Sequence, residues 1–94
     1  MKKYLIEREI PKVGELQGEP LRQAAATSNK ALAEIGANEI QWVESYVADN
    51  KTFCVYLAKD ESVIQKHAKL SGFPANKITE IGKVISPKTA NELS

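Results

Sequence analysis

Two β-rich segments lie on either side of the pair Asp49-Asn50 and set the topology of the chain. Residues 39–48 and 51–58 are rich in β-branched and aromatic side chains, which is typical of strands. Asp and Asn tolerate positive φ, so the pair between the segments favours a turn and a hairpin. The turn predicts these cross-strand pairs: Val47 with Thr52, Tyr46 with Phe53, Ser45 with Cys54, and Glu44 with Val55.

The hairpin is flanked on each side by one helical and one extended segment. Apolar spacing of 4, 3, 4 and 3 predicts a helix over residues 20–35, and a second helix runs from about residue 60 to a closing Gly72. Residues 3–10 and 77–85 are the remaining predicted strands. The order βαββαβ predicts an α+β fold of the ferredoxin-like type, a four-stranded antiparallel sheet with both helices on one face.

The length of 94 residues fits a single domain. We expect this domain to cover residues 1–86 and to be followed by a polar C-terminal tail, residues 87–94. Two helices on one face leave the other face of the sheet open. Because a small monomer seldom exposes a whole sheet face, we expect a homodimer through the open face.

Composition argues against several classes of protein. A formal net charge of +1 with dispersed basic residues indicates no nucleic-acid partner, and no apolar run is long enough to span a membrane. The apolar stretch after Met1 ends at Glu7, which is too short for a secretory signal. The single cysteine, Cys54, cannot form an internal disulfide. These features favour the cytoplasm.

The hairpin pairing divides the side chains between two faces, and the bulkier set is expected under the helices. That set is Trp42, Glu44, Tyr46, Phe53, Val55 and Leu57. Cys54 and Tyr56 then face a partner chain, where Cys54 packs as a small hydrophobe. Glu44 becomes a carboxylate among apolar groups, which needs a basic partner, an edge position, or a role as metal ligand or general base.

His67 is the only histidine and lies in the middle of the apolar face of the second helix. Its simplest interpretation is a hydrogen-bonded core residue. The alternative is a site, because this helix face should meet the sheet face that carries Glu44. Glu7 joins His67 and Glu44 only if its side chain points to the helix-covered face, and Ile6 and Ile10 favour the opposite orientation of that strand. One histidine with carboxylates suits zinc, nickel, iron or manganese, and it also suits acid–base chemistry.

Several motifs together resemble a known family. They are the segments at residues 4–8, 42–47, 51–58, 64–74 and 78–81. In this order they are similar to a family of small bacterial proteins of unassigned function, some described as nickel-binding. The resemblance covers about residues 3–86 and implies a ferredoxin-like fold and a homodimer that forms a dimeric α–β barrel. The family's motif positions include Glu7, Glu44, Tyr46, Cys54 and His67.

Three functional hypotheses follow. The first is a cytoplasmic homodimer that binds nickel or another divalent transition metal through His67, Glu44 and Glu7. The second is an enzyme of the dimeric α–β barrel kind, such as a cofactor-free monooxygenase or isomerase, that acts on a small molecule with His67 or Glu44 as general base. The third is a structural or regulatory dimer without a ligand.

Overall fold

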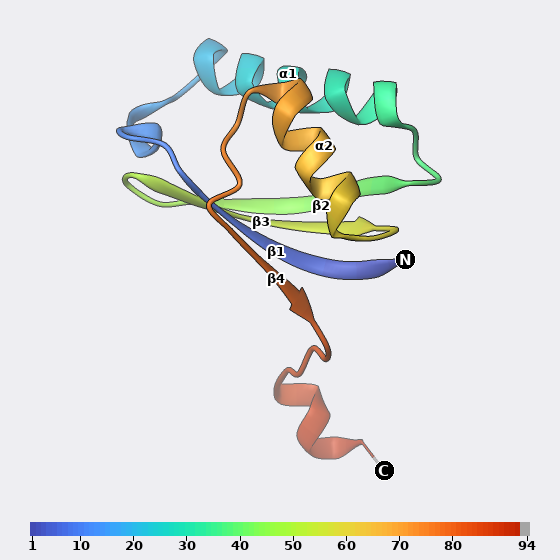
Figure 1. The fold of residues 1–94 in the computed structure, drawn as a ribbon. Coiled ribbons are helices and arrows are strands. Elements are labelled where there is room, and N and C mark those ends of the chain that lie inside the picture. The colour runs from blue at the N-terminus through green and yellow to red at the C-terminus, as the bar shows by residue number, and fades with distance from the viewer. Residues whose placement is uncertain (93–94) are drawn as a thin grey trace.

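Two helices cover one face of a four-stranded antiparallel sheet (Figure 1). The computed structural model describes residues 1–92. The elements are β1 Lys2–Glu9, η1 Val13–Glu15, α1 Glu19–Ile35, β2 Ile40–Val47, β3 Lys51–Ala58, α2 Glu61–Ser71, β4 Lys77–Ile81 and η2 Pro87–Asn91, where η denotes a 3-10 helix. The sheet order is β2-β3-β1-β4. This arrangement confirms the predicted βαββαβ fold.

The second helix is closed at both ends by the residues that the sequence indicated. The Asp60 carboxylate accepts a hydrogen bond of 3.2 Å from the Val63 amide, which caps the first turn of α2. Gly72 adopts a left-handed conformation with φ of 81°, and its amide donates to the Ala68 carbonyl. A side chain is strained at this φ, so glycine ends the helix at little cost. The last strand, β4, ends at Ile81, earlier than predicted.

The predicted hairpin register is confirmed, with one irregularity. Glu44 pairs with Val55 and Tyr46 with Phe53, but the ladder shifts between Trp42 and Glu44, so that Trp42 pairs with Tyr56. A β-bulge of this kind inserts one residue, here Val43, and reverses the alternation of faces beyond it. Trp42 therefore shares a face with Tyr56 rather than with Glu44.

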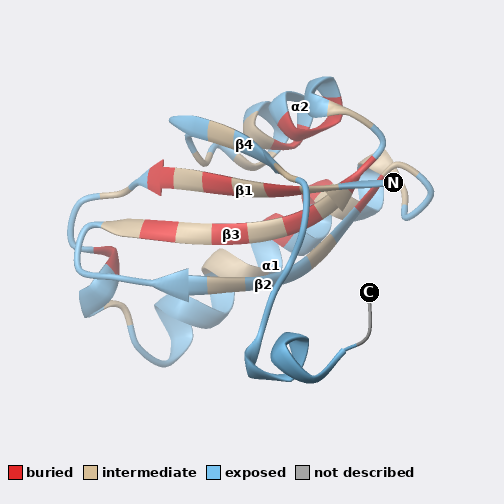
Figure 2. Ribbon diagram, turned by 90° about the horizontal axis from the view of Figure 1, so that it is seen from below, coloured by how far each residue is buried: buried red, intermediate tan, exposed pale blue. Residues whose placement is uncertain are grey.

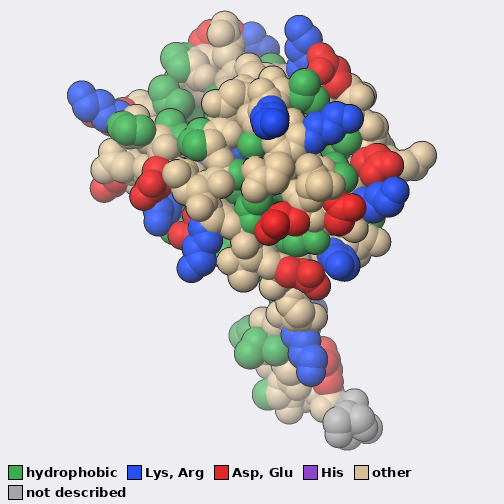
Figure 3. All heavy atoms as spheres, in the orientation of Figure 1, with side chains coloured by type: hydrophobic (Ala, Val, Ile, Leu, Met, Phe, Trp, Pro, Cys, Tyr) green, Lys and Arg blue, Asp and Glu red, His purple; other side chains and the backbone are tan. Residues whose placement is uncertain are grey.

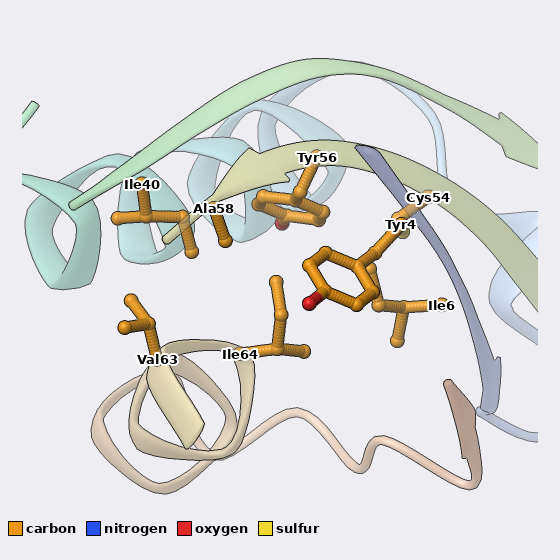
Figure 4. Close-up of a cluster of buried hydrophobic side chains, with 8 residues drawn as sticks. All are labelled: Tyr4, Ile6, Ile40, Cys54, Tyr56, Ala58, Val63 and Ile64. Carbon is orange, nitrogen blue, oxygen red and sulfur yellow. The ribbon is translucent and has the colours of Figure 1, made fainter. Parts of the chain in front are cut away.

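The core lies between the sheet and α2, as Figure 4 shows. Side chains from β1 and β3 point towards Val63 and Ile64 of α2. The buried members from the sheet are Tyr4, Ile6, Ile40, Cys54, Tyr56 and Ala58.

The prediction that the bulkier set of hairpin side chains lies under the helices was wrong for every residue of that set except Trp42. Glu44 and Tyr46 are exposed, whereas Cys54 and Tyr56, expected at a dimer interface, are 5% and 2% exposed inside the chain. Apolar bulk could not choose between the faces, because both faces of β3 are apolar. The inner face carries large aromatic side chains, Tyr4 and Tyr56, together with a polar group, Arg8, that has partners within the core.

The opposite face of the sheet is open and has no helix over it (Figure 2). β1 and β3 show alternating buried and intermediate residues along their length. The intermediate residues on this open face include Leu5, Phe53, Val55 and Leu57. The open face is thus apolar along its middle strands and uncovered within a single chain.

The C-terminal tail projects away from the sheet (Figure 1). All residues from 82 to 92 are exposed, including Val84 and Ile85, and η2 is capped by Ser86 and Thr89. The last two positions of the predicted tail, Leu93 and Ser94, lie outside the described residues. On the face drawn in Figure 3, basic and acidic side chains are interspersed, in keeping with the net charge of +1.

Candidate functional site

An apolar pocket of about 280 Å³ lies between the sheet and α1. Its walls come from β2, β3, η1, α1 and the loop after α2, and the apolar members include Val13, Leu16, Leu21, Ala25, Trp42 and Phe73. Polar groups enter the lining from Arg8, Ser28, Ser45, Thr52 and Tyr56. A mostly apolar cavity with a few convergent polar groups is the usual form of a small-molecule site.

Arg8 is a buried cation without an acidic partner. Arg8 is 2% exposed, and its Nη1 donates to the carbonyls of Phe73 at 3.3 Å and Pro74 at 3.1 Å. The guanidinium carbon lies 5.8 Å from the centre of the Tyr56 ring. No carboxylate within residues 1–92 forms a salt bridge with Arg8, and no Asp or Glu lines the pocket.

His67 is fully buried and bridges Arg8 and α1. Its Nδ1 lies 3.5 Å from Arg8 Nη2, and its Nε2 lies 3.2 Å from Ser28 Oγ. A guanidinium can only donate, so Nδ1 is the acceptor and Nε2 carries the hydrogen. Burial and then the charge of Arg8 lower the pKa of His67 to about 4, although a hydrogen bond to the Ser28 backbone opposes them. The imidazole is therefore neutral and a weak base.

The hydrogen-bond chain continues from His67 through Ser28 to Tyr56. The Ser28 hydroxyl lies 3.4 Å from the Tyr56 hydroxyl, and the Tyr56 and His67 rings are 5.2 Å apart. Ser28 can accept from His67 and still exchange a hydrogen bond with the Tyr56 hydroxyl, because its oxygen has two lone pairs and one hydrogen. Burial raises the pKa of Tyr56, while Ser28 and Arg8 oppose this, so the phenol is a neutral donor.

The three predicted metal ligands do not come together within one chain. His67 lies on the helix-covered side, whereas Glu7 and Glu44 lie on the open face. Over the residues that the structure describes, no three His, Cys, Asp or Glu side chains are grouped to hold a metal ion. Arg8 beside His67 would also repel a cation. A single chain therefore does not supply a complete ligand set, and neither Glu44 nor a free imidazole lone pair is available as a base in the pocket.

Glu7 and Glu44 have partners of their own on the open face. Lys51 Nζ lies 3.2 Å from Glu7 Oε1, and the Tyr46 hydroxyl donates to Glu44. β3 lies between the two carboxylates, so they are separated by two strand spacings, about 10 Å. Each carboxylate is held by its own partner and not by a group that they share.

Sequence reasoning missed Arg8 and Ser28 as members of a site. A signal for both was present. Arg8 continues the alternation of Tyr4 and Ile6, and Ser28 lies on the apolar stripe of α1. A polar residue in phase with buried apolar ones is the pattern that indicates a buried polar network.

Comparison with known proteins places the chain in a family. Residues 4–81 match the family described as Nickel responsive protein SCO4226-like. The chain belongs to this family. The match confirms the resemblance seen in the sequence motifs. The family description supports a metal-related role but names no binding residue.

A solved crystal structure shares the fold of this chain. The crystal structure of SCO4226 from Streptomyces coelicolor A3(2) superposes with a TM-score of 0.71 at 13% sequence identity. The similarity covers 88% of this chain and 99% of the other. No curated protein matches the chain. Among the described residues, every helix is too short or too polar to cross a membrane.

Proposed function

We propose that the protein is a homodimer that binds a divalent transition metal, nickel in the first place, at its open sheet face. The observation that carries this proposal is the pairing of an uncovered apolar surface with two carboxylates, Glu7 and Glu44, on the same face. The description of the family as nickel responsive supports the choice of metal.

The dimer is argued from the side chains that the open face leaves uncovered. Leu5, Val55 and Leu57 lie on adjacent strands and are only half-buried in one chain. Packing two open faces together would remove this surface from water. A two-fold axis would also double the number of acidic side chains at the interface, because each chain contributes the same patch.

The metal site is argued from the ligands that such a dimer would bring together. Glu7 and Glu44 are only two carboxylates, so a metal ion there needs further oxygen or nitrogen donors from the second copy or from water. Lys51 already neutralises Glu7, and a metal ion there would have to displace its ammonium group. His67 is not part of this ligand set, because it faces Arg8 on the other side of the sheet.

Calorimetric titration with nickel tests the metal, using the full chain. We expect saturable binding by the wild type and at least tenfold weaker binding by Glu7→Gln or Glu44→Gln. Glu34→Gln on the exposed side of α1 is the matched control, and His67→Gln should also bind as the wild type does. Nickel affinity that is unchanged in both Glu7→Gln and Glu44→Gln would refute the site.

Sedimentation velocity tests the dimer separately. Val55→Glu places a charge in the centre of the open face and should shift the protein from dimer to monomer. Ala33→Glu on the exposed surface of α1 is the control and should leave the dimer intact. A wild-type protein that sediments as a monomer at micromolar concentration would contradict this part of the proposal.

The compartment that we propose is the cytoplasm. Cys54 is a free and buried thiol, and a reducing compartment preserves such a group.

A further inference from the structure

A buried arginine without an acidic partner, at the wall of an apolar pocket, indicates a missing anion. We propose that the pocket between the sheet and α1 binds a small organic monocarboxylate with an apolar body, and that Arg8 is the partner of its carboxylate. This site lies on the helix-covered side of the sheet, so it is independent of the metal proposed for the open face.

The charge of the pocket is the first argument. Buried charges in proteins are normally paired, because an isolated ion loses its hydration. Arg8 is 2% exposed, and its partners in the described residues are all neutral: two backbone carbonyls, the His67 imidazole and the Tyr56 hydroxyl. His67 and Tyr56 are both neutral, and no acidic side chain lines the pocket. The lining thus carries one positive charge that no acidic side chain of residues 1–92 balances.

The second argument is the hydrogen-bonding capacity that the Arg8 guanidinium leaves unused. Two carbonyls hold Nη1 in place, and Nη2 makes only the long contact to His67. Nε of Arg8 makes no hydrogen bond among the described residues, and it is not sealed from solvent, because no buried side-chain nitrogen there lacks a partner. Nε and Nη2 form one edge of the guanidinium fork, which matches the two oxygens of a carboxylate. The Tyr56 hydroxyl is a further neutral polar group in the same lining.

The third argument is the composition and size of the remaining walls. Leu21, Ala25 and Trp42 offer apolar contacts, and about 280 Å³ is at the small end of ligand pockets. This space suits an alkyl chain of medium length or one aromatic ring. A phosphate would bring a second negative charge that the lining cannot balance, and a metal cation would be repelled by Arg8.

Binding of octanoate, with octan-1-ol as its uncharged analogue, tests the proposal. Trp42 is the only tryptophan and lines the pocket, so its fluorescence reports occupancy directly. We expect saturable binding of octanoate and at least tenfold weaker binding of octan-1-ol. No saturable octanoate binding would overturn the proposal, and equal affinity for the two compounds would overturn the role assigned to Arg8.

Two variants locate the binding. Arg8→Gln should weaken octanoate at least tenfold while octan-1-ol changes little. Ala25→Leu fills the pocket without touching the arginine and should abolish both signals, so it keeps the test valid if Arg8→Gln fails to fold. Ala33→Leu, on the exposed side of the same helix, is the control and should bind as the wild type does. Octanoate binding that survives Ala25→Leu unchanged would place the ligand elsewhere and overturn the proposal.

Discussion

Acid should destabilise the fold through His67 before most carboxylates titrate. In the folded chain the pKa of His67 is lowered from 6.5 to about 4, by burial and then by the charge of Arg8. The unfolded chain therefore takes up a proton below about pH 6.5, and the folded chain does so only near pH 4. The stability that neutral His67 contributes is complete above the unfolded pKa and is lost as the pH falls towards the folded pKa. The difference corresponds to about 3 kcal/mol of unfolding free energy.

Urea unfolding from about pH 7 to about pH 4, followed by Trp42 fluorescence, measures this loss. His67→Gln is the comparison, because it removes the only imidazole of the chain and leaves every carboxylate in place. We expect the wild type to lose about 3 kcal/mol more than His67→Gln over this range. Parallel pH profiles for the two proteins would refute the view that His67 is held neutral by its surroundings.

Three further substitutions test the local structure, the first two by urea or thermal unfolding and the third by hydrogen exchange. Ser28→Ala leaves the Nε2 hydrogen of His67 without its side-chain acceptor and should cost about 1–3 kcal/mol; a neutral effect would mean that the hydrogen-bond chain does not contribute. Gly72→Ala forces a side chain into a φ of 81° and should cost about 1–2 kcal/mol, which unchanged stability would contradict. Gly14→Ala puts a Cβ 2.6 Å from the Ala48 carbonyl oxygen, so the turn after β2 must shift. Faster hydrogen exchange of the residue 14 amide is expected, and unchanged exchange would count against this contact.

The order of elements and the hairpin register could be predicted from the sequence because each depends on local chemistry. Asp49-Asn50 fixed the turn, and with it the pairing of Glu44 with Val55. Gly72 marked the end of α2 because a left-handed residue follows the last turn. The turn and the helix cap each depend on residues that are close together in the sequence, so both can be predicted from the sequence alone.

The faces of the sheet could not be predicted in the same way. The bulge between Trp42 and Glu44 has no clear sequence signal, and it separates these two residues onto opposite faces. Large apolar side chains lie on both faces, with Phe53 and Leu57 outside and Tyr56 inside. Arg8 also lies inside. Apolar bulk is a poor guide when one face is buried by the chain itself and the other is left for a partner.

The candidate site was only half visible in the sequence for a related reason. His67 could be placed on the inner face of α2, but its partners come from β1 and α1, which are distant in the chain. Their identity depends on which way β1 turns its alternating residues. Once the side chain of Arg8 is turned inward, Glu7 must point outward, and the predicted cluster divides into a cationic pocket and an acidic open face.

A crystal grown with nickel and measured at the nickel absorption edge tests the central claim most directly. The anomalous difference map locates the metal without assuming its ligands. We expect a peak at the open face between two copies of the chain, within bonding distance of a Glu7 or Glu44 carboxylate. A peak beside His67 in the pocket, or no ordered peak in a crystal containing nickel, would contradict the account.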